Sequence, residues 1–456
     1  MSRNASKKID MTKGPIMRLV ILFAIPIIIG NVLQQLYNTI DTLIIGNFCD
    51  AVSLAAVGTS AQPVEVLLCV FMGIGSGISI LVSQYAGSRD EEKLRKIVET
   101  STAFLYLSAI PLTILGMFIG PLVLKIMQVP EDAWDLSNAY LRIIFLGTLG
   151  NMGYNLNAGI LRGVGDSRAS LIFLLISCVI NIVLDYLFVA IIPWGVEGAA
   201  IATVVAMYAS WVFSIVYMRK MYPELEFKWI PKKLDKQMLG SIISVGLPLG
   251  LNNSLYTVGH IVMQSLINMQ GSTFMAACAV ATKLTGIANV AITSFSNAAC
   301  TFSGQNLGAK DYVRLKKGHL LIPVWSGTVT CTAGVLLTIF CRPVLSIFTK
   351  DPAVLEMAAL YIRIVLPFTW LYAVFNGIIN YVNGVGEVRY TTIVNILMLW
   401  AVRIPVAYFI NYFIDGKYVM ASLPISFAFG MICMLCYYNT KKWKKLILPA
   451  TLAKAE

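Results

Sequence analysis

The chain has 456 residues, a formal net charge of +12, 57% hydrophobic residues and only 13% charged residues. A soluble domain carries about 25% charged residues, so this composition indicates an integral membrane protein and argues against a soluble enzyme. The positive charge could suggest a nucleic-acid partner, but its placement between apolar segments is that of a membrane orientation signal. We therefore expect no nucleic-acid binding.

Apolar stretches of about 20 residues, the length of helix that crosses a bilayer, recur along the whole chain. They predict an all-α membrane protein with twelve transmembrane helices. In chain order the predicted spans are 16–46, 53–85, 97–120, 135–160, 169–192, 196–218, 239–268, 273–304, 319–342, 354–382, 390–412 and 418–439.

The basic residues are unevenly divided between the two sides of these spans. Of the 35 Lys and Arg residues, 27 fall in the two termini and in every second loop, and only 4 fall on the other side. Short loops rich in Lys and Arg remain in the cytoplasm. We therefore expect a multi-pass protein of the cell membrane with both termini in the cytoplasm. A missed or extra span would destroy this alternation.

The two halves of the chain repeat each other in a nearly constant register. Segment 84–90 (QYAGSRD) returns as 305–311 (QNLGAKD), and 163–168 (GVGDSR) returns as 384–389 (GVGEVR). No strand precedes the glycine segments, so we interpret them as tight helix connections rather than phosphate-binding loops.

Two further pairs keep this register, the second of them to within one position. Tyr140 and Arg142 match Tyr361 and Arg363, and Pro26 matches Pro248. The repeat predicts an N-terminal six-helix lobe at 1–218, a basic cytoplasmic linker at 219–237 and a C-terminal six-helix lobe at 238–456. An even number of helices per copy orients both copies the same way, with a substrate path between them.

Polar residues form one stripe in the first span. Asn31, Gln34, Asn38 and Asp41 are spaced 3, 4 and 3 residues apart, which places them on one face of a helix. A charged group at this depth is costly and usually faces a cavity or a partner.

Three more polar residues fall at a similar depth in the fifth and sixth spans. Asn181 and Asp185 are four residues apart, and Thr203 follows in the next span. At 1.5 Å per residue, Asp41, Asp185 and Thr203 all lie roughly 10 Å below the outer face. Oxygen ligands suit Na⁺, and two neighbouring carboxyls can share a proton. The sequence thus predicts a coupling site for H⁺ or Na⁺, with no other cofactor.

An alternative interpretation is that these polar groups only hydrogen-bond neighbouring helices. It stays open for Asn181 and Thr203 taken alone. It is harder to sustain for Asp41 with Asp185, because buried carboxylates without a cation are difficult to stabilise.

Aromatic, methionine and amide side chains in the spans predict a cavity for amphipathic substrates. Many such residues simply pack in any bundle, and Glu65 could either attract a cationic substrate or pair with a base. The predicted cavity residues are Gln34, Tyr37, Asn38, Glu65, Met72, Asn155, Tyr256, His260, Met263, Phe295, Phe375 and Asn376.

The second half does not repeat the acidic residues. In the register of the repeat, the counterparts of Asn181, Asp185 and Thr203 are Val402, Val406 and Pro424, and the counterpart of Asp41 falls near Met263. The ionisable residues within these spans are instead His260, Lys283 and Arg403, whose roles stay open. The Cys433-x-x-Cys436 pair has no partner pair, which favours packing over metal or redox chemistry.

Segment 34–46 (QQLYNTIDTLIIG), with the turns at 84–87 and 305–308, is similar to the multidrug and toxic compound extrusion (MATE) family. The segment is especially similar to clostridial and staphylococcal multidrug members near the DinF-like branch, and the resemblance to the family covers nearly the whole chain. It implies a V-shaped fold and export of organic compounds driven by entry of H⁺ or Na⁺.

The resemblance also implies roles for particular residues. In that branch the N-terminal lobe has a cation site whose pattern falls here on Asp41, Asn181, Asp185 and Thr203. Pro26 matches the proline at which the first helix is proposed to bend. NorM-type relatives also carry acidic residues in the seventh and tenth helices. Here the seventh helix has none and the tenth has only Glu356 at its outer end, which argues against a second Na⁺ site.

The favoured function is therefore a monomeric antiporter that exports small, drug-like and often cationic compounds. The main alternative is a flippase for lipid-linked oligosaccharides, which would use basic residues such as Lys283 and Arg403 to hold a diphosphate. A membrane-embedded enzyme is disfavoured because the sequence shows no metal cluster or nucleophile–base pair. A channel is disfavoured because nothing resembles a selectivity filter.

Overall fold

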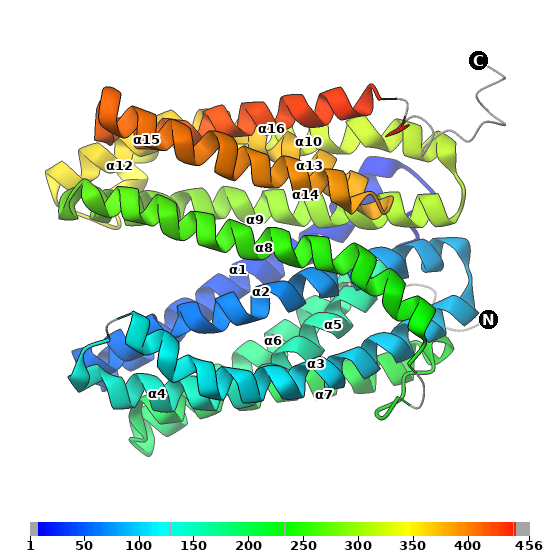
Figure 1. Ribbon diagram of the computed structural model, residues 1–456, viewed down its shortest axis with the longest axis horizontal. Helices are drawn as coiled ribbons and strands as arrows, with labels where there is room; N and C mark the ends of the chain where they lie inside the picture. Colours follow the sequence, from blue (N-terminus) through cyan, green and yellow to red (C-terminus); the bar gives the residue numbers. More distant parts are fainter. Residues whose placement is uncertain (1–7, 128, 232–233, 441, 444–456) are drawn as a thin grey trace. The chain divides into compact units, whose positions relative to one another are not determined.

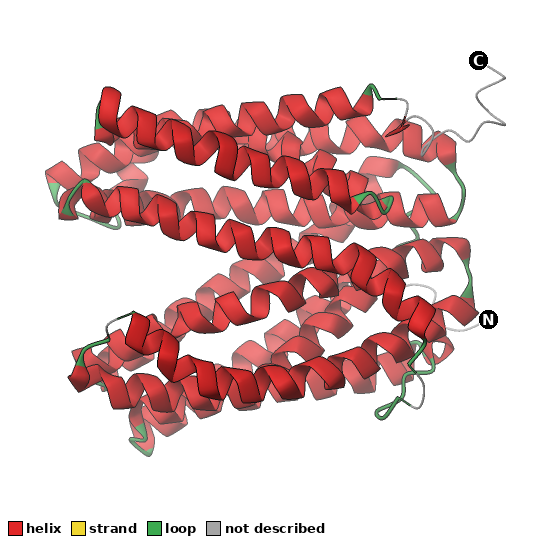
Figure 2. Ribbon diagram, viewed as in Figure 1, coloured by secondary structure: helices red, strands yellow, loops and turns green. Residues whose placement is uncertain are grey.

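The computed structural model describes residues 8–127, 129–231, 234–440 and 442–443, and within these it contains helices and connecting loops without strands (Figures 1 and 2). The all-α prediction is confirmed. The helices of the first half are α1 (Ile16–Phe48), α2 (Ala51–Ser88), α3 (Glu91–Ile126), α4 (Glu131–Leu146), α5 (Thr148–Val164), α6 (Ser167–Asp185), the π-helical η2 (Tyr186–Ile191), α7 (Gly195–Met221) and the short η3 (Pro223–Leu225).

The second half repeats this order. Its helices are α8 (Lys236–Met269), α9 (Ser272–Gly308), α10 (Tyr312–Ile339), α11 (Cys341–Leu345), α12 (Pro352–Val365), η4 (Leu366–Phe368), α13 (Thr369–Gly384), α14 (Val388–Ile396), the π-helical η5 (Leu397–Arg403), α15 (Ile404–Phe413), η6 (Gly416–Ala421) and α16 (Ser422–Tyr438).

Eleven helical stretches among the described residues are long and apolar enough to cross a membrane. The predicted span at 135–160 is not one of them, because it is divided at Gly147 into α4 and α5, of 16 and 17 residues. Gly147 retains a helix-like φ of −77°, and a Cβ at this position would lie 2.9 Å from the Val204 side chain. Together α4 and α5 supply the twelfth helical segment of the expected fold.

The irregularities of the helices repeat along with the sequence. A short break separates α12 from α13 and ends at Phe368. In the register that matches Arg142 with Arg363, Phe368 is the counterpart of Gly147. Pro367 lies within this break and lacks the N–H of a regular helix. The second helix after each break continues into a π-helical segment, η2 after α6 in the first copy and η5 after α14 in the second. The duplication therefore includes the departures from ideal helix as well as the helices.

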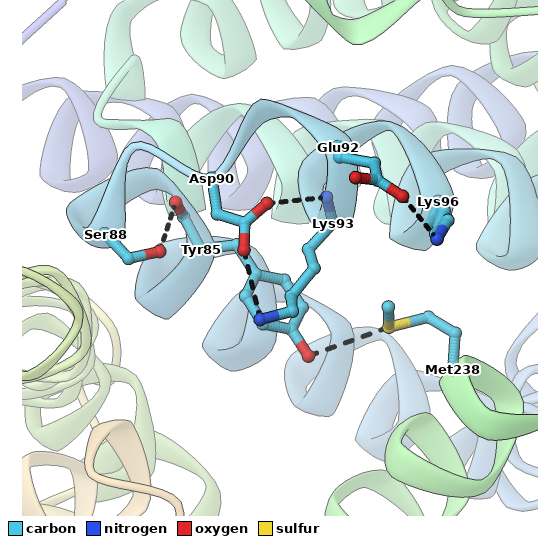
Figure 3. Close-up of polar contacts among 7 residues, drawn as sticks. All are labelled: Tyr85, Ser88, Asp90, Glu92, Lys93, Lys96 and Met238. Atoms are coloured by element: carbon cyan, nitrogen blue, oxygen red, sulfur yellow. Dashed lines mark hydrogen bonds and ion pairs between the residues drawn. The ribbon is translucent and has the colours of Figure 1, made fainter.

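The turns after α2 and α9 have the same construction. Arg89 and Lys310 have φ of 56° and 57°, and the residue after each is an aspartate that accepts a hydrogen bond from a backbone N–H at the start of the next helix. Figure 3 shows the first turn, where Asp90 accepts from the backbone N–H of Lys93 and its second oxygen lies 3.0 Å from the Lys93 ammonium. These two contacts hold the pKa of Asp90 below its usual value.

The glycine turn after α5 is also a helix connection. Gly165 has φ of 99°, and the buried Asp166 caps α6 by accepting from the Ala169 N–H. The other carboxyl oxygen of Asp166 accepts from the hydroxyls of Tyr217 and Tyr222, both at 2.8 Å, which fastens the turn to the end of α7. Burial and the Asp166 carboxylate raise the pKa of Tyr222.

The polypeptide divides into two compact units. One contains Ile25–Gly250, and the other contains Asp10–Ala24 and the described residues from Leu251 onward. These limits follow packing, whereas the predicted lobes follow the sequence repeat. In both α1 and α8 the change of unit lies within two residues of the repeated proline, Pro26 or Pro248.

Glycines bring α2 and the first part of α8 together within the first unit. A Cβ at Gly73 would overlap the backbone of Gly250, and one at Gly77 would lie 2.6 Å from the Cα of Gly246. Small residues that allow backbones to approach are the usual means by which membrane helices associate.

Candidate functional site

A cavity of about 550 Å³ lies within the first unit. It is lined by side chains of α1, α2, α4, α5, α6 and α7, including Pro26 at its α1 side. Four of the predicted cavity residues line it: Gln34, Tyr37, Met72 and Asn155. Asn38 is exposed on α1 and is not among the lining residues, and the side chain of Glu65 lies outside the described part of the chain.

Two carboxyl groups meet beside this cavity. Asp41 lies on α1, and Asp185 is the last residue of α6, where the helix changes to the π-helical η2. The two side chains are in direct contact, close enough to share a proton. Asp185 has no exposed surface at all. π-Helical turns within α-helices occur frequently at functional sites.

An amide and two hydroxyls complete the surroundings of the carboxyl pair. The buried Asn181 lies one turn before Asp185 and donates from Nδ2 to Thr203 Oγ1 at 3.3 Å. The hydroxyl of Tyr37 lies next to Thr203 and in the field of both carboxyls. The structure thus brings together Asp41, Asn181, Asp185 and Thr203, which the sequence predicts as one site. It adds Tyr37, which we expected only in the cavity.

The carboxyl pair lacks hydrogen-bond donors. Asp41 Oδ1, both carboxyl oxygens of Asp185 and Asn181 Oδ1 are buried without a hydrogen-bond donor of suitable geometry among the described residues. Orphaned buried carboxylate oxygens cost free energy, and a cation or a shared proton removes that cost. Four oxygens from three residues are also the ligand chemistry that a hard cation prefers. The residues present therefore fit either coupling ion.

Sequence reasoning missed Tyr140 of α4. Its hydroxyl lies in the field of Asp41, Asp185 and Tyr37, and the residue also lines the cavity. A signal was available, since Tyr140 belongs to a repeated motif. It was read only as evidence of duplication, because nothing in the sequence indicates which face of α4 meets α1.

In the second unit the predicted residues separate into two groups. Tyr256, His260 and Asn376 lie in or next to a polar cluster around the buried Arg403, and the Tyr256 and His260 rings are 4.8 Å apart. Met263 packs in an apolar cluster with Leu266, Leu399 and Ile404. Phe295 and Phe375 are buried as well, so the structure places these three apolar residues in packed core rather than on open surface.

Comparison with known proteins identifies the family. The MatE family model matches the chain twice, over residues 26–187 and 248–409, in the register of the internal repeat. "Probable multidrug resistance protein YoeA" of Bacillus subtilis (strain 168) is 29% identical over 449 residues, covering 95% of this chain and 96% of the relative. "Probable multidrug resistance protein YpnP" of the same organism is 26% identical over 445 residues, covering 97% and 99%.

A solved structure described as "MATE in the bent conformation" superposes with a TM-score of 0.89 at 20% identity, covering 100% of both chains. At this identity the superposition establishes the fold. The double match of the family model covers more than half of the chain, and the resemblance drawn from the sequence is thereby confirmed. The chain belongs to the MatE family of multi-pass membrane transporters.

Proposed function

We propose that the protein is an antiporter that exports amphipathic, often cationic organic compounds in exchange for H⁺ or Na⁺. The single observation that carries the coupling is the contact between Asp41 and Asp185, with three of the four carboxyl oxygens buried and lacking donors. The names of the curated relatives support the export of drugs.

The geometry suggests how the two sites communicate. Tyr37 and Thr203 line the 550 Å³ cavity, and both lie next to the carboxyl pair. A cation that neutralises the pair changes the charge at one end of the cavity. The coupling cation and a positively charged substrate compete for this one negative site. The substrate is therefore attracted while the carboxyl pair is charged, and it is released once the pair is neutral.

The movement that accompanies exchange is assigned to α1. This helix carries Asp41 and contains Pro26, which lines the cavity and removes one backbone hydrogen bond from the helix interior. The electrical gradient supplies about 2.3 kcal/mol per charge per 100 mV. A ligand changes a conformational equilibrium only by its difference in affinity for the two states.

Replacement of the carboxyls tests this proposal. Asp41→Asn and Asp185→Asn each remove one charge with little change in size, and we expect each to abolish uptake of H⁺ or Na⁺ coupled to drug export in proteoliposomes. Separate pH and Na⁺ gradients identify the ion. Asp135→Asn, a carboxyl on α4 of the same unit that lies outside the site, is the matched control. Full gradient-driven export by both site variants would refute the assignment.

The flippase alternative gains no specific support. It requires several basic groups to hold a diphosphate, and the two residues that suggested it differ in their surroundings, since Lys283 is exposed and Arg403 is buried. We propose further that both termini lie in the cytoplasm, which the distribution of Lys and Arg supports.

A further inference from the structure

Arg403 is one of the largest fully buried side chains in the described part of the chain, with 2% of its surface exposed. It is the last residue of the π-helical η5. Its Nε donates to Ser426 Oγ at 3.0 Å, and Ser426 donates its own hydroxyl to the carbonyl of Leu423. Ser426 therefore holds the guanidinium in place without neutralising it.

No carboxylate lies within 4.0 Å of Arg403 among the described residues, and its Nη2 has no hydrogen-bond acceptor there. The nearest compensation is aromatic. The guanidinium carbon lies 5.2 Å from the ring centre of Phe427 and 6.0 Å from that of Tyr256. A cation–π contact contributes about 0.5–2 kcal/mol, whereas burial of an ion costs several kcal/mol. The charge of Arg403 is thus only partly compensated.

Further hydrogen-bonding groups extend from the guanidinium to less buried positions. The Tyr256 side chain lies next to Arg403 and Tyr372, and the Asn376 amide donates to the backbone carbonyl of Tyr372 at 3.3 Å. Tyr256, Tyr372 and Asn376 are each half-buried. A ligand that approached Arg403 on their side would meet hydroxyl and amide groups beside the charge.

The internal repeat gives this cluster a counterpart in the first unit. In the register of the two family-model matches, which begin at residues 26 and 248, Tyr256 corresponds to Gln34 and His260 to Asn38. Arg403 lies one turn before Val406, which takes the place of Asp185 in the second copy. Tyr361, the copy of Tyr140, is likewise in the field of Arg403. Equivalent helices thus surround an acidic pair in one unit and a lone arginine in the other.

We propose that the second unit contains an anion site centred on Arg403, which binds the carboxylate of transported amphipathic compounds. Arginine matches a carboxylate with two parallel N–H···O bonds, and Nη2 is the donor without an acceptor. The proposal rests on the proposed export function, because the anion that compensates the charge of Arg403 is part of the transported molecule.

A matched pair of ligands tests the inference without depending on transport. An aromatic amine that carries a carboxylate, and its methyl ester, are titrated against the purified protein in lipid nanodiscs. We expect the wild-type protein to bind the acid at least about tenfold more tightly than the ester. Arg403→Gln should remove this preference, and Tyr256→Phe should reduce it. Arg363→Gln, an exposed arginine of the same unit, should retain it.

The ratio of the two affinities separates binding from folding, because a merely structural Arg403 would change both affinities together. Equal affinities in the wild-type protein, or an unchanged preference in Arg403→Gln, would overturn the proposal. If Arg403→Gln does not fold, the wild-type ratio and the Tyr256→Phe ratio decide it. Acetate should compete with the acid for the site. Chloride should weaken the binding of the acid no more than it weakens the binding of the ester. Competition by chloride equal to that by acetate would point to an inorganic anion and refute the carboxylate assignment.

A failure of the proposed function gives a different result. If wild-type cells do not export the ester, the proposed export function is refuted for such compounds. The ratio of the affinities for acid and ester still tests the anion site, because it is measured by binding alone.

Discussion

At the scale of single residues, the two carboxyls of the candidate cation site differ in their surroundings. Asp185 is fully buried at the end of α6, and both of its oxygens lack donors among the described residues. Asp41 is half-buried on α1, and only its Oδ1 is buried without a donor among the described residues. Thr203 connects the pair to the cavity, because it lines the cavity, its hydroxyl accepts from Asn181, and it lies next to Tyr37.

We predict that Thr203→Val weakens cation coupling without unfolding the protein. Valine has nearly the same shape, but it removes the hydroxyl that both Asn181 and Tyr37 contact. Loss of one hydrogen bond near a charged group corresponds to about a tenfold change in affinity. The cation concentration that gives half-maximal export in proteoliposomes should rise by about that factor.

Thr42→Val is the control for this measurement. The Thr42 hydroxyl is exposed and bonds only within α1, to the carbonyl of Asn38. An equal change in both variants would mean that Thr203 acts through the helix and has no particular relation to the cation.

At the scale of secondary-structure elements, the association of α2 with α8 depends on the absence of side chains. Gly73 and Gly77 of α2 meet Gly250 and Gly246 of α8 almost backbone to backbone. Gly75 lies between the two contact positions on α2, and a Cβ there would have no other atom within 4 Å. The same helix therefore contains glycines that packing requires and others, such as Gly75, that it does not.

We predict that Gly73→Val prevents normal folding and that Gly75→Val is tolerated. The valine at position 73 would overlap the Gly250 backbone, which no rotamer can avoid, and we expect a destabilisation of more than about 4 kcal/mol. The yield of monodisperse protein in detergent and its thermal unfolding temperature measure the difference. Equal behaviour of the two variants would show that α2 and α8 separate at little cost.

At the scale of the whole molecule, the chain is a duplication in which packing is repeated and chemistry is not. The two matches to the family model, the paired breaks at Gly147 and Phe368, and the paired turns at Arg89 and Lys310 all keep the register of the repeat. Both copies cross the membrane in the same direction if each contains six spans.

We predict that the linker faces the cytoplasm and the first turn of α4 faces outward. In a background in which the nine free cysteines are replaced, an impermeant thiol reagent should label Asp132→Cys in intact cells. It should label Lys228→Cys only after the membrane is opened. The reverse pattern would invert the topology, and labelling of both in intact cells would contradict an even number of spans per copy.

How far the site could be predicted differs from residue to residue. Helical spacing was sufficient to place Asn181 and Asp185 on one face, and depth counted along the spans suggested Asp41 and Thr203 as their neighbours. Spacing within one helix cannot tell which face meets another helix. Tyr140 was therefore missed, and Met263 and Phe375, which were expected in a cavity, lie in packed core.

The sequence by itself determined the membrane class, the helical repeat and the asymmetry of charge between its copies, because apolar length, periodicity and the identity of ionisable residues are local properties. Only the tertiary structure decided that Asp41 and Asp185 touch and that Arg403 is buried without a carboxylate partner among the described residues. Contacts between helices depend on rotation about each helix axis. That rotation is set by packing over the whole unit, including glycine contacts such as Gly73 with Gly250, and no short stretch of sequence contains it.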